Sequence, residues 1–379
     1  MGKAKIDITG SYTVQGEKGP LFSSAPTISL FSDGRLACCL REGTTKVSAD
    51  GIQRLFWSDD KGRTWTEGNS PTKSDSEKNK DFEYRKCYIR EISRDQYKAI
   101  YTKIDCSASR EGTFNLKHDG GLPRIKCMVE STDGGETWSE PAVISNDSDI
   151  IIHDEILADG FLVMPDSGEF VLAFETWKGW DGVFKFGQSP YCGVLISKDQ
   201  GKTWDEIAFN ANDPANHIYY GDQKTCILED GSLFSTFWTY DYFNNKDYNN
   251  HISISADGGR TWSGLTETNL HGQIACPLDM GHGMMLCTYN DRHSQKPGVK
   301  AVLSYDRGKT WDTQNQVTVW DPMIKSRDDE KKTLFQSIVD YSFGTPDITR
   351  ISEDEAACAY YCSNGKNTYV RVSIIKLDR

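Results

Sequence analysis

The chain is organised around pairs of short apolar segments, each pair joined by a tight polar turn. Val, Ile, Leu, Phe, Tyr and Cys alternate or run continuously on both sides of turns built from Gly, Asp and Ser. Six such pairs occur, at 25–42, 86–103, 160–176, 224–240, 273–289 and 346–362. Each pair predicts an antiparallel β-hairpin, because these side chains fit a pleated surface and Gly or Asp tolerates the turn conformation.

A recurring octet of the pattern S-x-D-x-G-x-T-W follows each of the first five hairpins. Its copies stand at 58–65, 131–138, 197–204, 255–262 and 304–311, so that successive copies begin 49 to 73 residues apart. That period accommodates four short strands with loops of variable length, and it is too long for most solenoid repeats. It is typical of the blades of a β-propeller.

The octet has the composition of a turn between two antiparallel strands. Its Asp can accept backbone N–H bonds across the turn, and its Gly can adopt a positive φ. Its Trp is then predicted to bury its ring against a neighbouring blade. A catalytic or calcium-binding role for these Asp residues is disfavoured, because one active site does not need five equivalent carboxylates.

Together the hairpins and octets predict an all-β fold, a six-bladed β-propeller with four-stranded antiparallel blades, in which residues 1–379 form a single domain. The last blade has only one later strand candidate, at 367–378. The N-terminal segment 5–14 is expected to supply its missing strand, which closes the ring and removes exposed strand edges. The polar segment 70–86 is predicted to be a long loop.

Charge and cysteine content restrict the partners and the compartment. The net charge is −12, from 43 basic and 55 acidic residues, which disfavours a nucleic-acid partner. No apolar run approaches the roughly 18 residues of a membrane span, and residues 1–10 contain no apolar signal segment, so no membrane partner is expected. The eleven cysteines form no CxxC pairs, which favours free thiols and a cytoplasmic location.

The octets resemble the Asp boxes of the sialidase (neuraminidase) superfamily, and the resemblance covers essentially the whole chain. It implies a glycan site at the centre of one face, built from the starts of the innermost strands and the loops after the second strands. It also implies three arginines that bind the sugar carboxylate, a nucleophilic Tyr paired with a Glu, and an Asp that acts as the acid.

The sequence departs from that pattern at the innermost strands. Counting back eight residues from each hairpin turn identifies the strand starts as Ser24, Lys86, Leu157, Gly221, Gln273 and Thr345, and none is an arginine. Sialic acid is therefore not the expected substrate. Tyr341 is the nearest substitute for the nucleophile, and Asp50 corresponds loosely to the acid, although Asp50 could equally be an ordinary turn residue.

Several polar and aromatic residues are expected to surround the centre of the same face. Arg41, Glu175 and Trp238 lie seven residues after hairpin turns, and others lie at strand ends or starts. Carboxylates can bond sugar hydroxyls and indole rings can cover the apolar patches of a sugar. The substrate-binding set predicted in this way comprises Arg41, Trp177, Gln223, Trp238, Asp241, Gln273, Asp291 and Arg292.

Glu175 and Asp222 are the predicted catalytic carboxylates, with Asp50 as a third candidate, because glycoside cleavage usually needs two carboxyl groups beside the scissile bond. Either residue could instead anchor a loop through backbone N–H groups. The leading hypothesis is a glycoside hydrolase acting on a small oligosaccharide or glycoside. A non-catalytic carbohydrate-binding propeller and a lyase acting on uronic-acid sugars are the alternatives, the lyase using Arg41 or Arg292 to pair the substrate carboxylate.

No cofactor or metal site is expected. The run His153, Asp154 and Glu155 contains metal-ligand residue types, but strand alternation would point neighbouring side chains to opposite faces.

Overall fold

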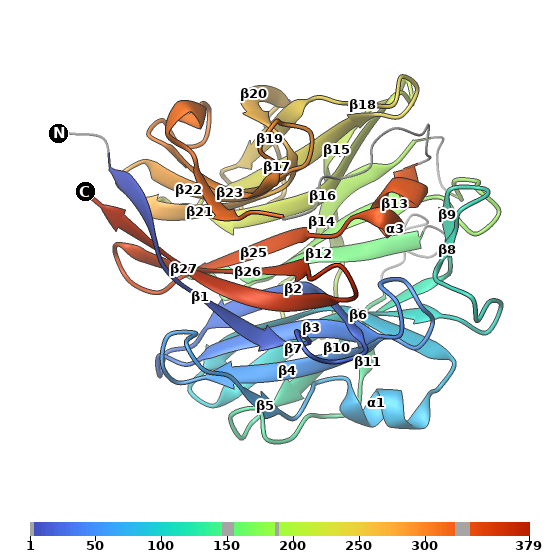
Figure 1. Ribbon diagram of the computed structural model, residues 1–379. Coiled ribbons are helices and arrows are strands. Elements are labelled where there is room, and N and C mark those ends of the chain that lie inside the picture. Colours follow the sequence, from blue (N-terminus) through green and yellow to red (C-terminus); the bar gives the residue numbers. More distant parts are fainter. Residues whose placement is uncertain (1–3, 146–154, 186–188, 323–333) are drawn as a thin grey trace.

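Six antiparallel sheets radiate from a common centre in the computed structural model, which describes residues 4–145, 155–185, 189–322 and 334–379 (Figure 1). The innermost strands β2, β6, β12, β16, β21 and β25 contact one another in a closed ring. The fold is therefore the six-bladed β-propeller that the hairpins and octets predict.

Blades I to III follow one another along the chain, each built outward from its innermost strand. Blade I contains β2 (Phe22–Leu30), β3 (Leu36–Gly43), β4 (Ile52–Ser58) and β5 (Thr66–Gly68). Blade II contains β6 (Phe82–Ser93), β7 (Gln96–Asp105), β10 (Arg124–Ser131) and β11 (Ala142–Val143), and blade III contains β12 (Glu155–Val163), β13 (Phe170–Trp177), β14 (Tyr191–Ser197) and β15 (Glu206–Asn212).

Blades IV and V repeat this arrangement. Blade IV contains β16 (Ile218–Ile227), β17 (Leu233–Asp241), β19 (Asn249–Ser255) and β20 (Thr266–His271), with the short β18 (Lys246–Asp247) added to β17. Blade V contains β21 (Gln273–Gly281), β22 (Met284–Asp291), β23 (Gly298–Ser304) and β24 (Val317–Trp320).

The two ends of the chain meet in blade VI. It contains β25 (Gly344–Arg350), β26 (Glu355–Ser363) and β27 (Thr368–Asp378), and its outermost strand is the N-terminal β1 (Lys5–Gln15). β1 pairs antiparallel with β27 from Lys5 opposite Asp378 to Gln15 opposite Val370. The blue and red ends of the ribbon accordingly lie side by side in Figure 1.

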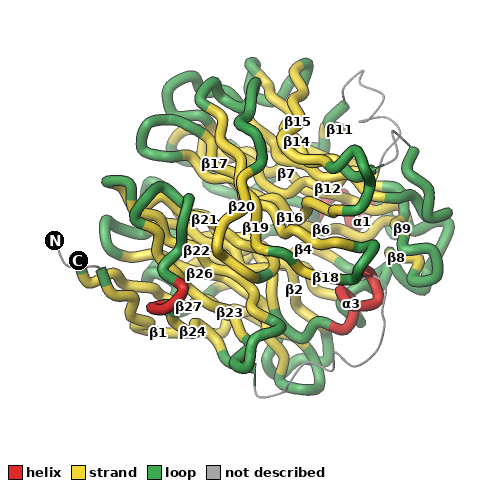
Figure 2. Tube along the Cα trace, turned by 90° about the horizontal axis from the view of Figure 1, so that it is seen from above, coloured by secondary structure: helices red, strands yellow, loops and turns green. Residues whose placement is uncertain are grey.

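Little of the described chain is helical, as Figure 2 shows in red. The prediction of a continuous loop over 70–86 is wrong, because α1 (Lys73–Lys78) and the start of β6 lie within it. The carboxylate of Asp75 explains the helix: it is buried, accepts a 2.9 Å hydrogen bond from the Tyr101 hydroxyl and lies 3.1 Å from Lys103 Nζ. A polar sequence can thus be fixed in place by one buried ion pair that its composition does not reveal.

The octets form the turns between the third and fourth strands of blades I to V. In the copy at 131–138, Asp133 accepts bonds from the Thr137 amide and hydroxyl, and the Ser131 hydroxyl accepts one from the Gly135 amide. Gly135 has a φ of +90°, in the left-handed region that the turn requires. The same bonds recur in the other four copies.

Each octet packs against the preceding blade. The Trp204 ring, for example, belongs to a core cluster that includes Tyr88 and Met128 of blade II. Trp204 and Trp311 are buried, whereas the rings of Trp65, Trp138 and Trp262 are only partly covered. The octets therefore hold adjacent blades together, to an extent that differs from copy to copy.

All eleven cysteines lie within the described residues; each is a buried thiol that forms no disulfide. In the part of the chain that the structure describes, no helix is long and apolar enough to cross a membrane.

Candidate active site

A ring of β-bulges surrounds the centre of one face of the propeller. In every blade the pairing between the first and second strands contains a register shift, for example between Ser24 and Thr27 of β2. In five of these innermost strands a residue other than glycine has a φ between +45° and +49° at the bulge; these are Ala25, Lys86, Asp222, Ile274 and Thr345. Such a backbone is unfavourable, most of all for β-branched residues, and strain of this kind gathers at functional sites.

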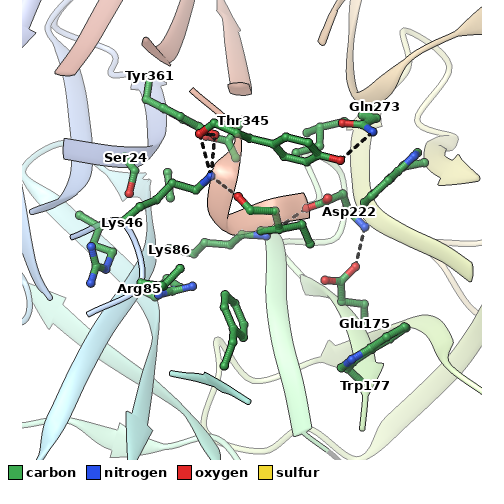
Figure 3. A pocket seen from close by; sticks show the side chains of 18 of the residues that line it. Ser24, Lys46, Arg85, Lys86, Glu175, Trp177, Asp222, Gln273, Thr345 and Tyr361 are labelled. Atoms are coloured by element: carbon green, nitrogen blue, oxygen red, sulfur yellow. Dashed lines mark hydrogen bonds and ion pairs between the residues drawn. The ribbon is translucent and has the colours of Figure 1, made fainter. Parts of the chain in front are cut away.

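All five of these residues line one pocket, with a cavity volume of about 130 Å³ (Figure 3). Every blade contributes to its wall, together with Ile338 of α3 (Leu334–Asp340) and Phe114 of β8 (Phe114–Asn115), which pairs with β9 (Gly120–Gly121). α3, β8 and β9 lie at the same end of the blades, on the right in Figure 1. The pocket is thus a pit surrounded by residues of all six blades.

Two carboxylates enter this pit from adjacent blades. Glu175 lies near the end of β13, and its Oε2 accepts a 2.5 Å hydrogen bond from the Asp222 amide and a 3.1 Å bond from the Tyr219 hydroxyl. The Asp222 carboxylate lies 3.9 Å from Lys86 Nζ. Figure 3 shows the bond from the Asp222 amide and the Glu175 side chain, which points toward Asp222.

Aromatic rings form the wall on the side of blades III and IV. Trp177, Tyr219 and Trp238 are all buried, and Tyr219 contacts both indoles edge-on, with ring centroids 4.9 Å from Trp177 and 5.7 Å from Trp238. Trp177 follows Glu175 by two residues on the same strand, so strand alternation places both side chains on one face. This wall provides the flat apolar surface that sugar C–H groups prefer.

Cations dominate the rest of the wall. Its lining contains four arginines and two lysines but only the two carboxylates of Glu175 and Asp222; the cations are Arg41, Lys46, Arg85, Lys86, Arg124 and Arg292. The chain as a whole has a net charge of −12, so the positive charge of the pocket is a local feature. A low-dielectric pit lined by cations favours an anionic ligand.

Three of these arginines lie directly over glycines. A Cβ at Gly51 would collide with the guanidinium of Arg41, a Cβ at Gly121 with that of Arg124, and a Cβ at Gly344 with that of Arg292. A side chain at any of these positions would therefore displace the guanidinium that lies over it.

The guanidinium of Arg41 is bound by the protein itself. Its Nε pairs with Glu83, and its terminal nitrogens donate to the carbonyl oxygens of Thr45 at 2.9 Å and Ser48 at 2.7 Å. Arg41 was predicted to bind substrate from its strand-end position. It lines the pocket, but its hydrogen bonds hold the loop between β3 and β4.

Lys46 in that loop connects blade I to the segment before blade VI. Its Nζ donates to the carbonyl oxygens of Ile338 and Tyr341 and to the Tyr361 hydroxyl at 3.2 Å. Burial lowers the pKa of Lys46 well below its usual value, and the nearby charges of Arg292 and Arg85 lower it further. The lysine therefore holds α3 against the pocket.

Of the residues predicted from the sequence, seven line the pocket: Arg41, Glu175, Trp177, Asp222, Trp238, Gln273 and Arg292. Four lie outside its wall: Asp50, Gln223, Asp241 and Asp291.

The three carboxylates outside the pocket stabilise turns. Asp50 is exposed and accepts bonds from the Thr44 amide and the Ser48 hydroxyl. Asp241 accepts a 2.8 Å bond from the Asn244 amide, and Asp291 accepts bonds from the amide and hydroxyl of Ser294. An Asp at a strand end commonly caps the turn that follows, which is the interpretation that the sequence left open for Asp50.

Gln223 is buried beneath the bulge of β16. Its Nε2 donates to the Thr225 hydroxyl at 3.1 Å and to the Ser235 hydroxyl at 3.2 Å. The bulge explains its place: Asp222, at positive φ, points into the pocket, and the next side chain turns into the core.

The same geometry explains residues that the sequence did not assign to the site. Counting from the hairpin turns identified Lys86 but not Arg85, because strict alternation allows only one of two neighbours to face the pocket. At the bulge alternation is interrupted, and both residues line the wall. Arg124, Lys46 and Tyr219 carry no comparable signal, since they reach the pocket from loops or strand ends.

The described residues contain no group of three or more His, Cys, Asp or Glu side chains able to hold a metal ion. His153 and Asp154 lie outside the described residues, and nothing of the Glu155 side chain is described.

A six-bladed propeller with a polar and aromatic pit at its centre is the architecture of sialidase-like proteins. The chain belongs to the family described as BNR repeat-like domain, which matches residues 100–321. A sialidase of Paraclostridium sordellii is 24% identical over 210 residues, which are 52% of this chain and 50% of that protein. The chain thus spans about half the length of the curated relatives it matches.

Two solved structures show the same fold along the whole chain. A protein of unknown function from Dyadobacter fermentans has a TM-score of 0.69 and 14% identity, covering 98% of this chain and 99% of its own. The α-L-arabinanase of Penicillium chrysogenum, complexed with arabinobiose, has a TM-score of 0.64 and 12% identity, covering 98% of each chain. The curated relatives are named as sialidases, and the two structures, at 14% and 12% identity, show the shared fold.

Proposed function

We propose that the protein is a glycoside hydrolase that removes an acidic sugar unit from the end of a small oligosaccharide or glycoside. The observation that carries this proposal is that Glu175 and Asp222, from neighbouring blades, line one central pocket together with Arg85, Arg124 and Arg292. A pocket surrounded by all six blades suits the end of a sugar chain, and the arginines supply the planar donors that match a carboxylate.

The two carboxylates have different surroundings, which suggests different roles. Asp222 lies near the Lys86 ammonium, which stabilises its ionised form. Glu175 lies beside the aromatic wall, and its Oε2 accepts hydrogen bonds from the Tyr219 hydroxyl and the Asp222 amide. In this proposal Glu175 protonates the leaving oxygen as the glycosidic C–O bond breaks, water attacks the anomeric carbon, and ionised Asp222 accepts the proton of that water.

Paired substrates test the proposal. Aryl glycosides and disaccharides ending in glucuronate or N-acetylneuraminate are compared with the corresponding glucosides and galactosides, and released sugar is measured. Cleavage confined to acidic termini is expected. Equal cleavage of the neutral compounds would contradict the acidic specificity, and cleavage of none would contradict the assignment as a hydrolase.

The cation cluster is tested with Arg85→Gln. Arg85 is 12% exposed, its Nε pairs with Glu83 at 2.9 Å, and its Nη2 donates to the Thr113 hydroxyl at 3.2 Å. Glutamine keeps a polar side chain at this position and removes the positive charge. We expect KM for the acidic glycoside to rise roughly tenfold or more, as for a lost charged hydrogen bond. Arg94→Gln is the control, because Arg94 is 86% exposed and lies outside the pocket.

A lyase acting on a uronic-acid sugar is the second candidate. The Arg292 guanidinium lies 3.8 Å from the centre of the Tyr341 ring, so a cation that could neutralise a uronate carboxylate stands beside a phenol that could transfer a proton. A lyase product carries a new C=C bond and takes up no oxygen from water. Reaction in ¹⁸O-labelled water therefore separates the two, since only hydrolysis incorporates the label.

A further inference from the structure

The short strand β18 places the carboxylate of Asp247, in blade IV, beside His293 and Gln273 of blade V. Asp247 pairs with Tyr240 of β17, and its side chain is 6% exposed. Its Oδ1 accepts a 2.6 Å bond from Trp238 Nε1, and its Oδ2 lies 2.7 Å from His293 Nε2. Although burial opposes ionisation, the bonds from His293 and Trp238 lower the pKa of Asp247 below its ordinary value. Asp247 is therefore a buried carboxylate held from two sides.

The third partner of Asp247 is Gln273, at the bulge of β21. Gln273 Nε2 donates to Asp247 Oδ2 at 3.1 Å and to the Tyr341 hydroxyl oxygen at 3.1 Å, while its Oε1 accepts a 2.6 Å bond from Arg292 Nε. A reversed amide would place its oxygen against the carboxylate and its NH2 group against the guanidinium, which is repulsive on both sides. The charges of Asp247 and Arg292 thus determine the orientation of this amide.

That orientation affects two residues of the pocket. Because the Tyr341 hydroxyl oxygen accepts from Gln273, its own O–H is available to donate elsewhere. Burial raises the pKa of Tyr341, so the hydroxyl keeps its proton. The Arg292 guanidinium is held at Nε by Gln273 and lies over the rings of Tyr341, at 3.8 Å, and Phe343, at 4.5 Å.

We propose that Asp247, supported by His293, is a positioning residue: by orienting Gln273 it directs Tyr341 and Arg292 as hydrogen-bond donors toward the anionic group of the substrate. This inference rests on the proposed function for the identity of the ligand, and it concerns a residue outside the lining of the pocket. Asp247 does not itself reach the substrate.

Asp247→Asn tests this, because the amide keeps the shape of the side chain and removes its charge. Asp241→Asn is the matched control: Asp241 ends β17, which pairs with β18, and its carboxylate accepts hydrogen bonds from Phe243, Asn244 and Tyr248 rather than from Gln273. We expect KM for the acidic glycoside to rise roughly tenfold in Asp247→Asn, with a smaller change in kcat, and we expect little change in either constant in Asp241→Asn. Wild-type KM in Asp247→Asn, or an equal loss in the control, would overturn the proposal.

A second measurement keeps the test independent of turnover. Calorimetry with sodium glucuronate and with N-acetylneuraminate measures binding to the wild type and to both variants, and a crystal structure of Asp247→Asn locates Gln273. A rotated or displaced Gln273 amide, released from Arg292, supports the proposal, and an unchanged Gln273, Arg292 and Tyr341 arrangement refutes it. If the wild type neither cleaves nor binds either acid, the proposed function fails while the crystal structure still decides the role of Asp247.

Discussion

The side-chain oxygen Oε2 of Glu175 lies 2.5 Å from the backbone nitrogen of Asp222, and this hydrogen bond joins the end of β13 to the bulge of β16. The contact links blades III and IV at the pocket and places the two carboxylates of its lining next to each other. Asp222 has a φ of +45°, and the bond from its amide to a carboxylate helps to stabilise that unfavourable backbone.

The first prediction concerns these two carboxylates. Glu175→Gln and Asp222→Asn keep the shape of each side chain and remove its ability to carry or accept a proton. Each variant should lose about a hundredfold or more in kcat on the cleaved glycoside while remaining folded, since acid–base groups typically contribute that much.

Asp291→Asn serves as the control for both variants, because Asp291 caps the turn at Ser294 outside the pocket and should keep wild-type turnover. Wild-type turnover in both Glu175→Gln and Asp222→Asn would exclude the pair as the catalytic groups. If the wild-type protein binds sugars but cleaves no glycoside, a carbohydrate-binding propeller is favoured instead.

The second prediction compares two octet tryptophans at the same position of the repeat. Trp204 is 2% exposed, and Trp204→Ala should lower the free energy of unfolding by about 3–5 kcal/mol, as for other buried aromatic truncations. Trp138, which is partly exposed, should lose less on the same substitution, about 1–2 kcal/mol from the smaller area that it buries. Urea unfolding measures both, and equal losses would contradict the difference in burial.

The third prediction concerns Asp347, a buried carboxylate near the propeller axis. Its Oδ2 accepts a 2.8 Å bond from the Ile28 amide of blade I, and its Oδ1 lies 3.7 Å from Lys224 Nζ of blade IV. Asp347→Asn removes the negative charge that faces the buried Lys224 ammonium, so stability should fall by about 3 kcal/mol.

Glu355→Gln is the matched control for Asp347, since Glu355 pairs with Lys61 in an ion pair whose side chains are 28% and 53% exposed. That variant should change stability by less than about 1 kcal/mol. Calorimetric melting of both proteins distinguishes them, and similar shifts would show that Asp347 does not link the blades.

The fourth prediction concerns stability in acid. The Thr137 hydroxyl, the Thr137 amide and the Ser131 hydroxyl lower the pKa of Asp133 from 3.8 to about 2. Because the unfolded chain takes up this proton at higher pH than the folded one, the contribution of Asp133 is complete above pH 3.8 and disappears as the pH falls toward about 2. Asp199 behaves alike, with its pKa lowered to about 2 chiefly by the Thr203 amide.

Asp133→Asn tests this dependence. The urea midpoints of the variant and the wild type are compared between pH 2 and pH 7. The two midpoints should differ most at neutral pH and should converge as the pH falls from 3.8 toward about 2. A difference that stays constant across the series would mean that the bonds to Asp133 do not depend on its charge.

The sequence alone determined the architecture of the propeller, because each blade is specified by local chemistry. Alternating apolar residues define the strands, and the octet at 131–138 contains every group that its turn uses, from the Ser131 hydroxyl to the Asp133 carboxylate. Such signals act over a few residues and recur, so they can be recognised without knowledge of the tertiary structure. The same reasoning identified Glu175, Trp177 and Asp222, which stand where an apolar strand meets the pocket.

The tertiary structure decided which polar side chains face the pocket. Asp241 and Asp291 share with Glu175 a place at a strand end, yet they bond to the turns that follow them. Arg85 lines the pocket because a bulge interrupts the alternation of β6, and Arg124 does so because Gly121 leaves room for its guanidinium. These choices depend on backbone conformation and on contacts between blades that are distant in sequence. The pattern of residues along one strand does not encode them, because the direction of a side chain is determined by the groups that surround it after folding.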